Sequence, residues 1–296
     1  MNTEAAKALV TMRTKCPLVH NITNFVAMDI AANTLLAVGA SPIMAHAVEE
    51  VEEMASICSC TVINIGTLAA PWIEGMIKAA KKANSIGKGW VLDPVGAGCR
   101  YPYLLSICEQ FIICILDIKS ICLIEYNIII IKKNKNETLA KLLELHPTII
   151  RGNASEIIAL AGAGAGGKGV DSTDSSNSAI EPAKRLAKKC NCVVAVSGAS
   201  DYATDGERVI KIDNGVEMCT KITAAGCSLS ALTGAFLGAG FEPILAAAYA
   251  FVTFGLASEI ALKSAKGPGS LRMELMDSLY NLTEEDVIQG AKISYL

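Results

Sequence analysis

The sequence predicts an α/β protein built on a central, mostly parallel β-sheet, and three observations support that fold class. Short apolar runs alternate with helical stretches along most of the chain, the pattern of parallel strands joined by crossover helices. Hydrophobic residues make up 52% of the chain and aromatic residues only 5%, which favours aliphatic packing of helices on a sheet. Several apolar runs also end in small or polar residues, at the strand ends where such sheets bind ligands.

Composition argues against several classes of partner. A net charge of −3 without a basic block speaks against nucleic acid. Eleven scattered cysteines, an odd number in a long chain, favour free thiols in a reducing compartment, and the lack of paired C-x-x-C elements argues against zinc. The N-terminus lacks an apolar signal sequence, and the most apolar segment, 111–131, is interrupted by charges. These features predict a cytoplasmic protein that binds neither nucleic acid nor a membrane.

Before residue 100, the expected elements follow from apolar periodicity and from helix start and stop signals. We expect helices over 1–15, 25–38, 48–57 and 71–86, with strands at 18–24, at 41–45, within 60–68 and within 90–98. Asn24 can cap the second helix, but the loop HNITN carries more hydrogen-bonding groups than a cap needs.

After the middle of the chain the same alternation resumes. We expect helices over 137–145, 179–189, 242–264 and 271–281, a strand, loop and helix within 147–162, and a strand at 192–196. A hairpin with strands 201–205 and 208–212, turning at Asp205-Gly206, is expected at the sheet edge.

The stretch 101–136 does not fit this alternation. It is rich in isoleucine, shows neither the strand nor the helix period and ends in a Lys/Asn run. Because a segment of this kind is unusual inside a compact α/β domain, we interpret it as translated non-coding sequence or as a lineage-specific insertion. The length allows one large or two small domains, and we predict a single domain, 1–296, that carries this insert.

The most informative stretch is ITAAGCSLSALTGAF at 222–236. Its small residues, Ala224, Ala225 and Gly226, predict a tight turn that opens a buried helix. A helix N-terminus binds phosphate, and its field lowers the pKa of a thiol, so Cys227 is expected to be partly activated there. The alternative is a packed helix start in which Cys227 is an inert small hydrophobe.

Two further groups of polar residues follow predicted strands. Asp93 lies at the end of one strand, although Asp-Pro more often simply starts a turn. Arg151, Asn153 and Glu156 lie where another strand becomes a helix, a combination that suits phosphate and Mg²⁺. A capping box on Asn153 or Ser155 explains the same residues equally well.

The glycine-rich run GAGAGGKG at 162–169 looks like a nucleotide-binding loop but departs from both common patterns. It follows a helix rather than a strand, and Gly169 stands where a P-loop needs Ser or Thr. We therefore expect a surface loop.

Eight blocks, in one order, resemble the hydroxyethylthiazole kinase family of the ribokinase-like superfamily. They are PLVHNITN, ASPIMA, INIGTL, VLDPVGAG, PTIIRGNASEI, GGKGVDS, VVAVSG with DYATDG, and AAGCSLSAL. The resemblance covers nearly the whole chain outside 101–136. It implies a three-layer α/β/α fold, ATP-dependent phosphorylation of 4-methyl-5-(2-hydroxyethyl)thiazole in thiamine synthesis or salvage, and a homotrimer with active sites between subunits.

The resemblance also implies roles for individual residues. Arg151 and Ser197 would contact ATP, while Asp93 and Glu156 would hold Mg²⁺ directly or through water. The thiazole alcohol would be bound by Met44, Asn24 and Ala224, with Cys227, the catalytic residue, beside its hydroxyl group.

The chain departs from the family at the turn before Cys227, where Ala224 and Ala225 replace the usual Gly and Thr. Alanine at a position that needs a positive φ strains the anion-binding turn. Two other functions fit the sequence: a kinase for another small alcohol such as hydroxymethylpyrimidine, whose relatives usually carry Asp where Cys227 stands, and a non-catalytic ligand-binding relative.

Overall fold

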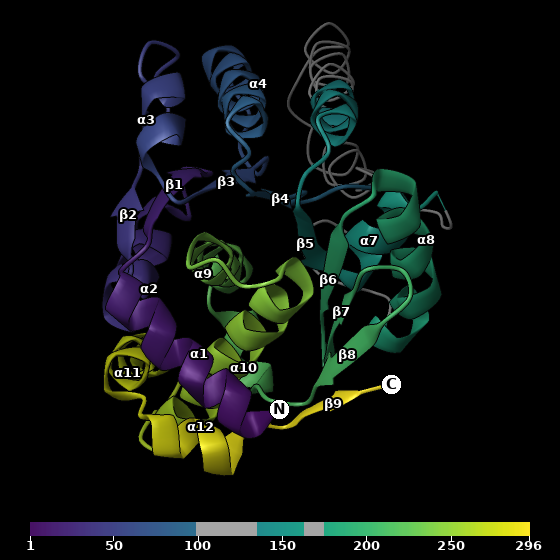
Figure 1. Cartoon of the computed structure of the whole chain (residues 1–296). Coiled ribbons are helices and arrows are strands. Elements are labelled where there is room, and N and C mark those ends of the chain that lie inside the picture. Colours follow the sequence, from purple (N-terminus) through teal and green to yellow (C-terminus); the bar gives the residue numbers. More distant parts are fainter. Residues whose placement is uncertain (99–134, 163–174) are drawn as a thin grey trace, which may run out of the picture.

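The computed structural model describes residues 1–98, 135–162 and 175–296, and in these parts nine strands form one sheet (Figure 1). Their order is β2-β1-β3-β4-β5-β6-β7-β8-β9. The strands are β1 (Leu18–Ile22), β2 (Ser41–Ile43), β3 (Cys60–Asn64), β4 (Trp90–Asp93), β5 (Ile149–Asn153), β6 (Val193–Ser197), β7 (Asp201–Thr204), β8 (Val209–Ile212) and β9 (Ile293–Tyr295). The first six are parallel and the last three antiparallel, which confirms the predicted mostly parallel sheet.

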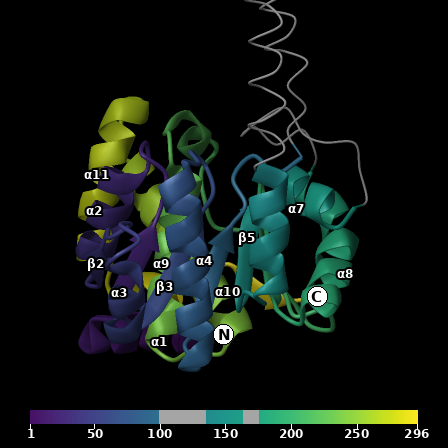
Figure 2. The same ribbon diagram turned by 90° about the horizontal axis from the view of Figure 1, so that it is seen from above.

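Helices cover both faces of this sheet (Figure 1). One layer holds α3 (Val51–Ile57), α4 (Ala70–Ser85), α7 (Ala154–Leu160), α8 (Ile180–Cys190) and a helical stretch at 135–144. The other holds α1 (Asn2–Lys15), α2 (Met28–Val38), α9 (Ala225–Gly238), α10 (Pro243–Leu262), α11 (Pro268–Asn281) and α12 (Glu284–Gly290). Figure 2 shows α8 at the opposite end of the molecule from α2 and α11. The three-layer arrangement agrees with the expected fold.

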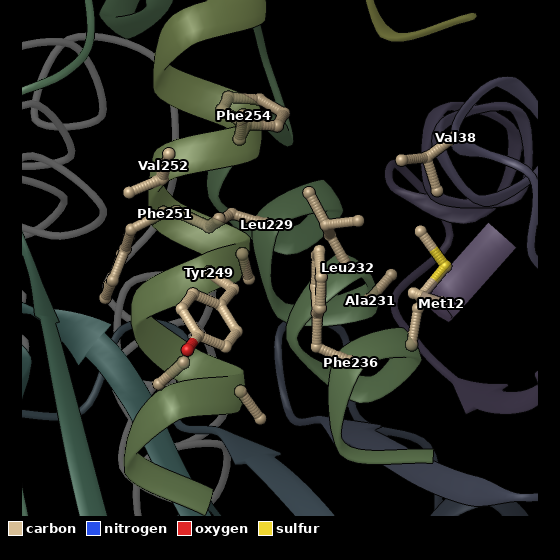
Figure 3. Packing of buried hydrophobic residues seen from close by; sticks show 14 of the residues in the cluster. Met12, Val38, Leu229, Ala231, Leu232, Phe236, Tyr249, Phe251, Val252 and Phe254 are labelled. Carbon is tan, nitrogen blue, oxygen red and sulfur yellow. The ribbon is translucent and has the colours of Figure 1, made fainter. Parts of the chain in front are cut away.

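The larger hydrophobic core lies between the sheet and the paired helices α9 and α10 (Figure 3). Phe236 and Phe251 are completely or almost completely buried there, at 0% and 1% exposure. Gly234 lets α9 approach the sheet, because a Cβ at this position would lie 2.5 Å from the Val62 side chain of β3. This close packing fixes the height and rotation of α9 over β1 and β3.

Helix α10 is long and apolar enough to cross a membrane by length and composition alone, but 83% of its most apolar window is buried inside the protein. A buried helix of this kind is apolar on every side because it has no solvent face. The stretch 111–131 lies outside the described residues.

The element boundaries differ from the predictions in a few places that have physical reasons. Helix α2 begins at Met28 rather than residue 25, because the Asn24 side chain accepts hydrogen bonds from the N–H groups of Val26 and Ala27 and holds a turn there. The short elements α12 and β9 were not predicted, and β9 forms the sheet edge beyond the hairpin of β7 and β8.

Candidate active site

The candidate site lies at the carboxyl ends of the parallel strands, beside the point where the strand order reverses. The chain runs from β1 outward to β2 and then returns to β3 on the other side of β1. Crevices at such reversals are the usual ligand sites of open α/β sheets. Asn24 follows β1, Asn64 and Asp93 are paired end residues of β3 and β4, and α9 begins close to them.

A hydrogen-bond network joins Cys227 to these strand ends. Asn64 Nδ2 donates to Cys227 Sγ at 3.2 Å and to Asp93 Oδ2 at 2.7 Å. Asn24 Nδ2 donates to Cys227 Sγ at 3.4 Å and to Asn64 Oδ1 at 2.9 Å. The structure therefore brings together Asn24, Asp93 and Cys227, which the sequence analysis had placed in one site.

Asp93 is fully buried and uses its two carboxylate oxygens unequally. Oδ2 accepts from Asn64 and also from Ser230 Oγ at 2.7 Å, whereas Oδ1 has no hydrogen-bond partner among the described residues. Burial raises the pKa of this carboxyl above its ordinary value, although Arg151, Ser230 and Asn64 act in the opposite direction. A buried carboxylate oxygen without a partner is costly unless a ligand completes it.

Glu156 lies near Asp93 and takes part in the capping box that the sequence suggested. Asn153 Oδ1 accepts from Glu156 N at 3.0 Å, and Glu156 Oε2 accepts from Asn153 N at 2.8 Å. Its other oxygen accepts from Gly96 N at 2.8 Å, across from the loop after β4. Burial, and then the charge of Asp93, raises the pKa of Glu156 to about 7. The capping role is thus present, and it holds this carboxylate beside the one of Asp93.

Arg151 extends from β5 toward the start of α9 and the end of β6. Its Nη2 donates to Ser197 Oγ at 2.6 Å, while its buried Nε has no partner among the described residues. A Cβ at Gly226 would lie 2.8 Å from Arg151 Nη1, so the guanidinium would have to shift if this residue were not glycine. Arg151 and Ser197, both predicted to contact ATP, therefore form one unit next to the first turn of α9.

The predicted activation of the Cys227 thiol is wrong. Burial, and then the charge of Asp93, raises the pKa of Cys227 to about 12, although hydrogen bonds from Asn24 and Asn64 favour the thiolate. The field of a helix terminus is worth a few tenths to about 2 kcal/mol, and the desolvation of a buried thiolate outweighs it. Cys227 is a neutral thiol at physiological pH.

The predicted strain before Cys227 is confirmed. Ala224 has φ 61° and ψ 14°, in the left-handed region, and it is the N-cap residue of α9. A residue with a Cβ pays about 1–2 kcal/mol for this conformation. Ala225 follows as the first residue of the helix.

Met44 is half-buried and lies directly after β2, where its carbonyl oxygen is 3.3 Å from His46 Nδ1. No hydrogen bond joins it to the network around Cys227 in the part of the chain that the structure describes. Its predicted contact with the thiazole stays a prediction. Of the glycine-rich run only Gly162, with φ 71°, is described, and it follows the end of α7; residues 163–169 lie outside the described residues.

Asn64 and Ser230 were not predicted to have a role in the site. Both are buried and both donate to Asp93 Oδ2. Ser230 lies three residues after Cys227 and hence on the same face of α9, and this spacing could have indicated it. Asn64 ends a strand whose loop continues as Ile-Gly-Thr, a position where asparagine usually serves a turn.

A magnesium site fits the donor set that Asp93 and Glu156 provide. No group of three or more His, Cys, Asp or Glu side chains that could hold a metal occurs among the described residues. Mg²⁺ at a nucleotide site is normally held by one or two carboxylates together with phosphates and water. Asp93 Oδ1, which has no partner in the described parts of the chain, and the nearby Glu156 carboxylate are consistent with that pattern.

Comparison with known proteins identifies the family. The sequence profile of the Hydroxyethylthiazole kinase family matches residues 9–116 and 131–285. The chain belongs to the hydroxyethylthiazole kinase family. The resemblance found in the sequence, the fold expected from it and the kinase class are thereby confirmed. The two matched stretches leave out residues 117–130, so the family profile accounts for part of the atypical stretch 101–136.

Relatives named hydroxyethylthiazole kinase match almost the full length. The one from Leptospira biflexa is 46% identical over 282 residues, which are 95% of this chain and 94% of the relative. The one from Zea mays is 45% identical over 293 residues, covering 97% of this chain and 91% of the relative. The solved structure of hydroxyethylthiazole kinase protein from Pyrococcus horikoshii is 39% identical, with a TM-score of 0.82 and 99% of both chains covered.

A more distant solved structure is similar in fold alone. Pyridoxal kinase from Staphylococcus aureus, solved with AMP-PCP and pyridoxal, has a TM-score of 0.59 at 14% identity, with 95% of this chain and 98% of that chain covered.

The left-handed conformation at position 224 predicts that Ala224→Gly stabilises the protein by up to about 1 kcal/mol, because glycine adopts this region without strain but loses more freedom on folding. Urea unfolding of the purified variant measures this. Exposed Cys16, the C-cap of α1 with φ 42°, gives a matched control, since Cys16→Gly is expected to change stability in the same direction. Exposed Lys7, inside α1, gives the opposite control: Lys7→Gly is expected to destabilise by about 1 kcal/mol.

Asp201 predicts a pH dependence of stability. Burial raises its pKa to about 7, so the folded protein holds this proton more tightly than the unfolded chain between about pH 4 and 7. Stability is therefore expected to fall as pH rises through this window, by on the order of 2 kcal/mol between pH 5.5 and 8 from this group alone. Asp201→Asn keeps an acceptor for Gly198 N and is expected to flatten the curve.

Urea unfolding at both pH values measures the change. Replacing Asp213 by Asn serves as the control and should leave the pH dependence unchanged. The pKa of Asp213 is lowered by Ser200 and Lys211, so this carboxylate stays ionised over the whole range. An unchanged slope in Asp201→Asn would contradict the assignment.

Proposed function

We propose that this chain transfers the γ-phosphoryl group of ATP to the hydroxyethyl group of 4-methyl-5-(2-hydroxyethyl)thiazole, giving the thiazole phosphate and ADP for thiamine synthesis. The observation that carries the proposal is the convergence of a buried carboxylate, an arginine and a thiol at the start of α9. Asp93 and Cys227 share Asn64 as hydrogen-bond partner, and Arg151 lies against Gly226 of the same helix turn. Family membership supplies the substrate class.

Arg151 and Ser197 are the residues that we assign to nucleotide binding. The Nε of the guanidinium has no partner among the residues that the structure describes, and its charge lies near Asp93 and the start of α9. We assign Arg151 to the phosphates and Ser197, held 2.6 Å from it, to ATP as well. Phosphoryl transfer depends mainly on position and charge neutralisation, for which a fixed cation suffices.

Asp93 and Glu156 are the residues that we assign to Mg²⁺, directly or through water. When bound, the ion neutralises charge on the phosphates. Asp93 offers Oδ1, since its other oxygen is occupied by Asn64 and Ser230. Glu156 is kept in place by the two backbone N–H groups that it accepts from.

The alcohol side is formed by Asn24, Met44, Ala224 and Cys227. Helix geometry leaves the N–H groups of the first turn without intrahelical acceptors. They would stabilise negative charge on the phosphoryl group in flight. Cys227, half-buried at the same turn, would orient the substrate hydroxyl or take up its proton. Since its thiol is neutral, its contribution is that of a weak base at most.

We also propose a cytoplasmic homotrimer of single-domain subunits with active sites between subunits. Beside Asn24, the side chains of Phe25 and Val26 are 63% and 57% exposed, and Phe25 contacts only Trp72 among ring partners of the described residues. Large apolar side chains exposed next to a site are suited to a subunit contact. Light scattering on the purified protein measures the mass of the assembly.

Release of ADP in the presence of the thiazole alcohol tests the function. Activity with that alcohol and not with hydroxymethylpyrimidine supports the proposal, whereas the reverse preference indicates another small-alcohol kinase. No ADP with either alcohol would indicate a ligand-binding relative. Running the assay on protein with and without 101–136 tests whether this stretch is a dispensable insert.

Arg151→Ala is expected to raise the KM for ATP by about 10- to 100-fold, because it removes the charge that we assign to the phosphates and leaves Ser197 without its donor. Steady-state kinetics with varied ATP measure this. Arg185, on the exposed side of α8, provides a control in which the same substitution should leave the KM unchanged. An unchanged KM in Arg151→Ala would contradict the assignment.

Cys227→Asp is expected to keep the enzyme active. Asn24 and Asn64 both direct N–H groups at this position, and a carboxylate accepts such bonds better than sulfur and is a competent base. Turnover of the thiazole alcohol by the purified variant provides the measurement. An inactive but folded variant would mean that Cys227 serves a purpose other than proton acceptance.

A further inference from the structure

Asn64 is a fully hydrogen-bonded side chain that contacts both Asp93 and Cys227, and the resemblance assigned it no role. It is 1% exposed and lies at the end of β3. Its Oδ1 accepts from Gly66 N at 3.0 Å and from Asn24 Nδ2 at 2.9 Å, while its Nδ2 donates to Asp93 and to Cys227. An amide group has two N–H bonds and two oxygen lone pairs, so the hydrogen-bonding capacity of this side chain is used completely.

The orientation of this amide follows from chemistry alone. The backbone N–H of Gly66 can only donate, so the Asn64 atom 3.0 Å from it is the oxygen, and the nitrogen faces Asp93 and Cys227. Asn24 is fixed in the same way, because its oxygen accepts from the N–H groups of Val26 and Ala27. Two amide nitrogens therefore direct N–H groups at one sulfur.

This arrangement restricts what the residue at position 227 can do. Cys227 Sγ receives N–H groups at 3.2 and 3.4 Å, so its hydrogen-bonding contact with the protein is as an acceptor. Asn64 Nδ2 also donates to Asp93 Oδ2 at 2.7 Å, so the same amide group fixes the position of the sulfur relative to Asp93. The group beside the alcohol and the carboxylate on the nucleotide side are therefore held by one planar amide.

We propose that Asn64 is a positioning residue that sets Cys227 and Asp93 at a fixed separation, so that the acceptor alcohol and the phosphoryl group meet in line. This inference rests on the proposed function. Asn64 touches neither substrate, and it acts through the two side chains that do. Ser230 supports it by donating to the same oxygen of Asp93 from the next turn of α9.

The expected signature is a loss of turnover without a comparable loss of nucleotide binding. In Asn64→Ala, kcat with the thiazole alcohol is expected to fall by about 10- to 100-fold, as small displacements of reacting groups do. The KM for ATP should stay within about 3-fold, because Ser230 still donates to Asp93 Oδ2 and the Arg151–Ser197 hydrogen bond does not involve Asn64. Asn64→Ser keeps one donor, so its kcat should lie between the values for Asn64→Ala and the wild type. This variant provides the test if the alanine variant does not fold.

A double-mutant cycle with Cys227→Ala separates positioning from general structural damage. If Asn64 acts through the thiol, the fold-loss of kcat in the double variant is smaller than the product of the fold-losses in the two single variants. Independent effects would give that product. Asn21, a buried asparagine of β1 whose Nδ2 bonds locally to Val19 O, is the matched control, and Asn21→Ala should leave kcat within about 2-fold.

The outcomes are distinguishable. A wild-type enzyme that releases no ADP with the thiazole alcohol would overturn the proposed function itself. An active wild type, together with a folded Asn64→Ala variant of unchanged kcat or with multiplicative losses in the cycle, would overturn the role of Asn64 alone.

Discussion

The buried carboxylate of Asp93 is the constraint around which the site is arranged. Removing a charge from water is costly unless hydrogen bonds or an opposite charge compensate. Asn64 and Ser230 both donate to Oδ2, and the charge of Arg151 lies close enough to lower the pKa. These partners come from β3, α9 and β5, so satisfying one carboxylate fixes three elements relative to each other.

Core packing and site geometry depend on the same helix. The close approach of Gly234 to Val62 sets α9 against β3, and Phe236 fills the core further along the helix (Figure 3). Because these residues belong to one helix, contacts two turns along α9 determine where Cys227 and Ser230 lie relative to Asn64 and Asp93. A change in the core packing of α9 is therefore also a change in the distance between the groups of the site.

The alternating helices and strands, and the site residues at the strand ends, could be predicted from the sequence. Parallel strands bring their carboxyl ends to one edge of the sheet in any strand order. The sequence could not supply the hydrogen bonds of Asn64, which join residues 163 positions apart at Cys227 and depend on which strands are neighbours. It also misjudged the Cys227 thiol, because the helix field is readable from a motif whereas desolvation depends on the burial of the folded site. The short β9 lacked enough residues to show a period.

The small residues before Cys227 illustrate why a motif needs a structure to be interpreted. Gly226 is in close contact with another side chain, since a Cβ there would lie 2.8 Å from the Arg151 guanidinium. Position 224 has a conformational requirement instead, with φ 61°, and alanine meets it at the expense of strain. The left-handed turn at 224 immediately precedes the first residue of α9, so the strain lies at the start of the helix that carries Cys227. A substitution of Ala for Gly therefore costs backbone energy at 224, whereas at 226 it would displace the end of the Arg151 side chain.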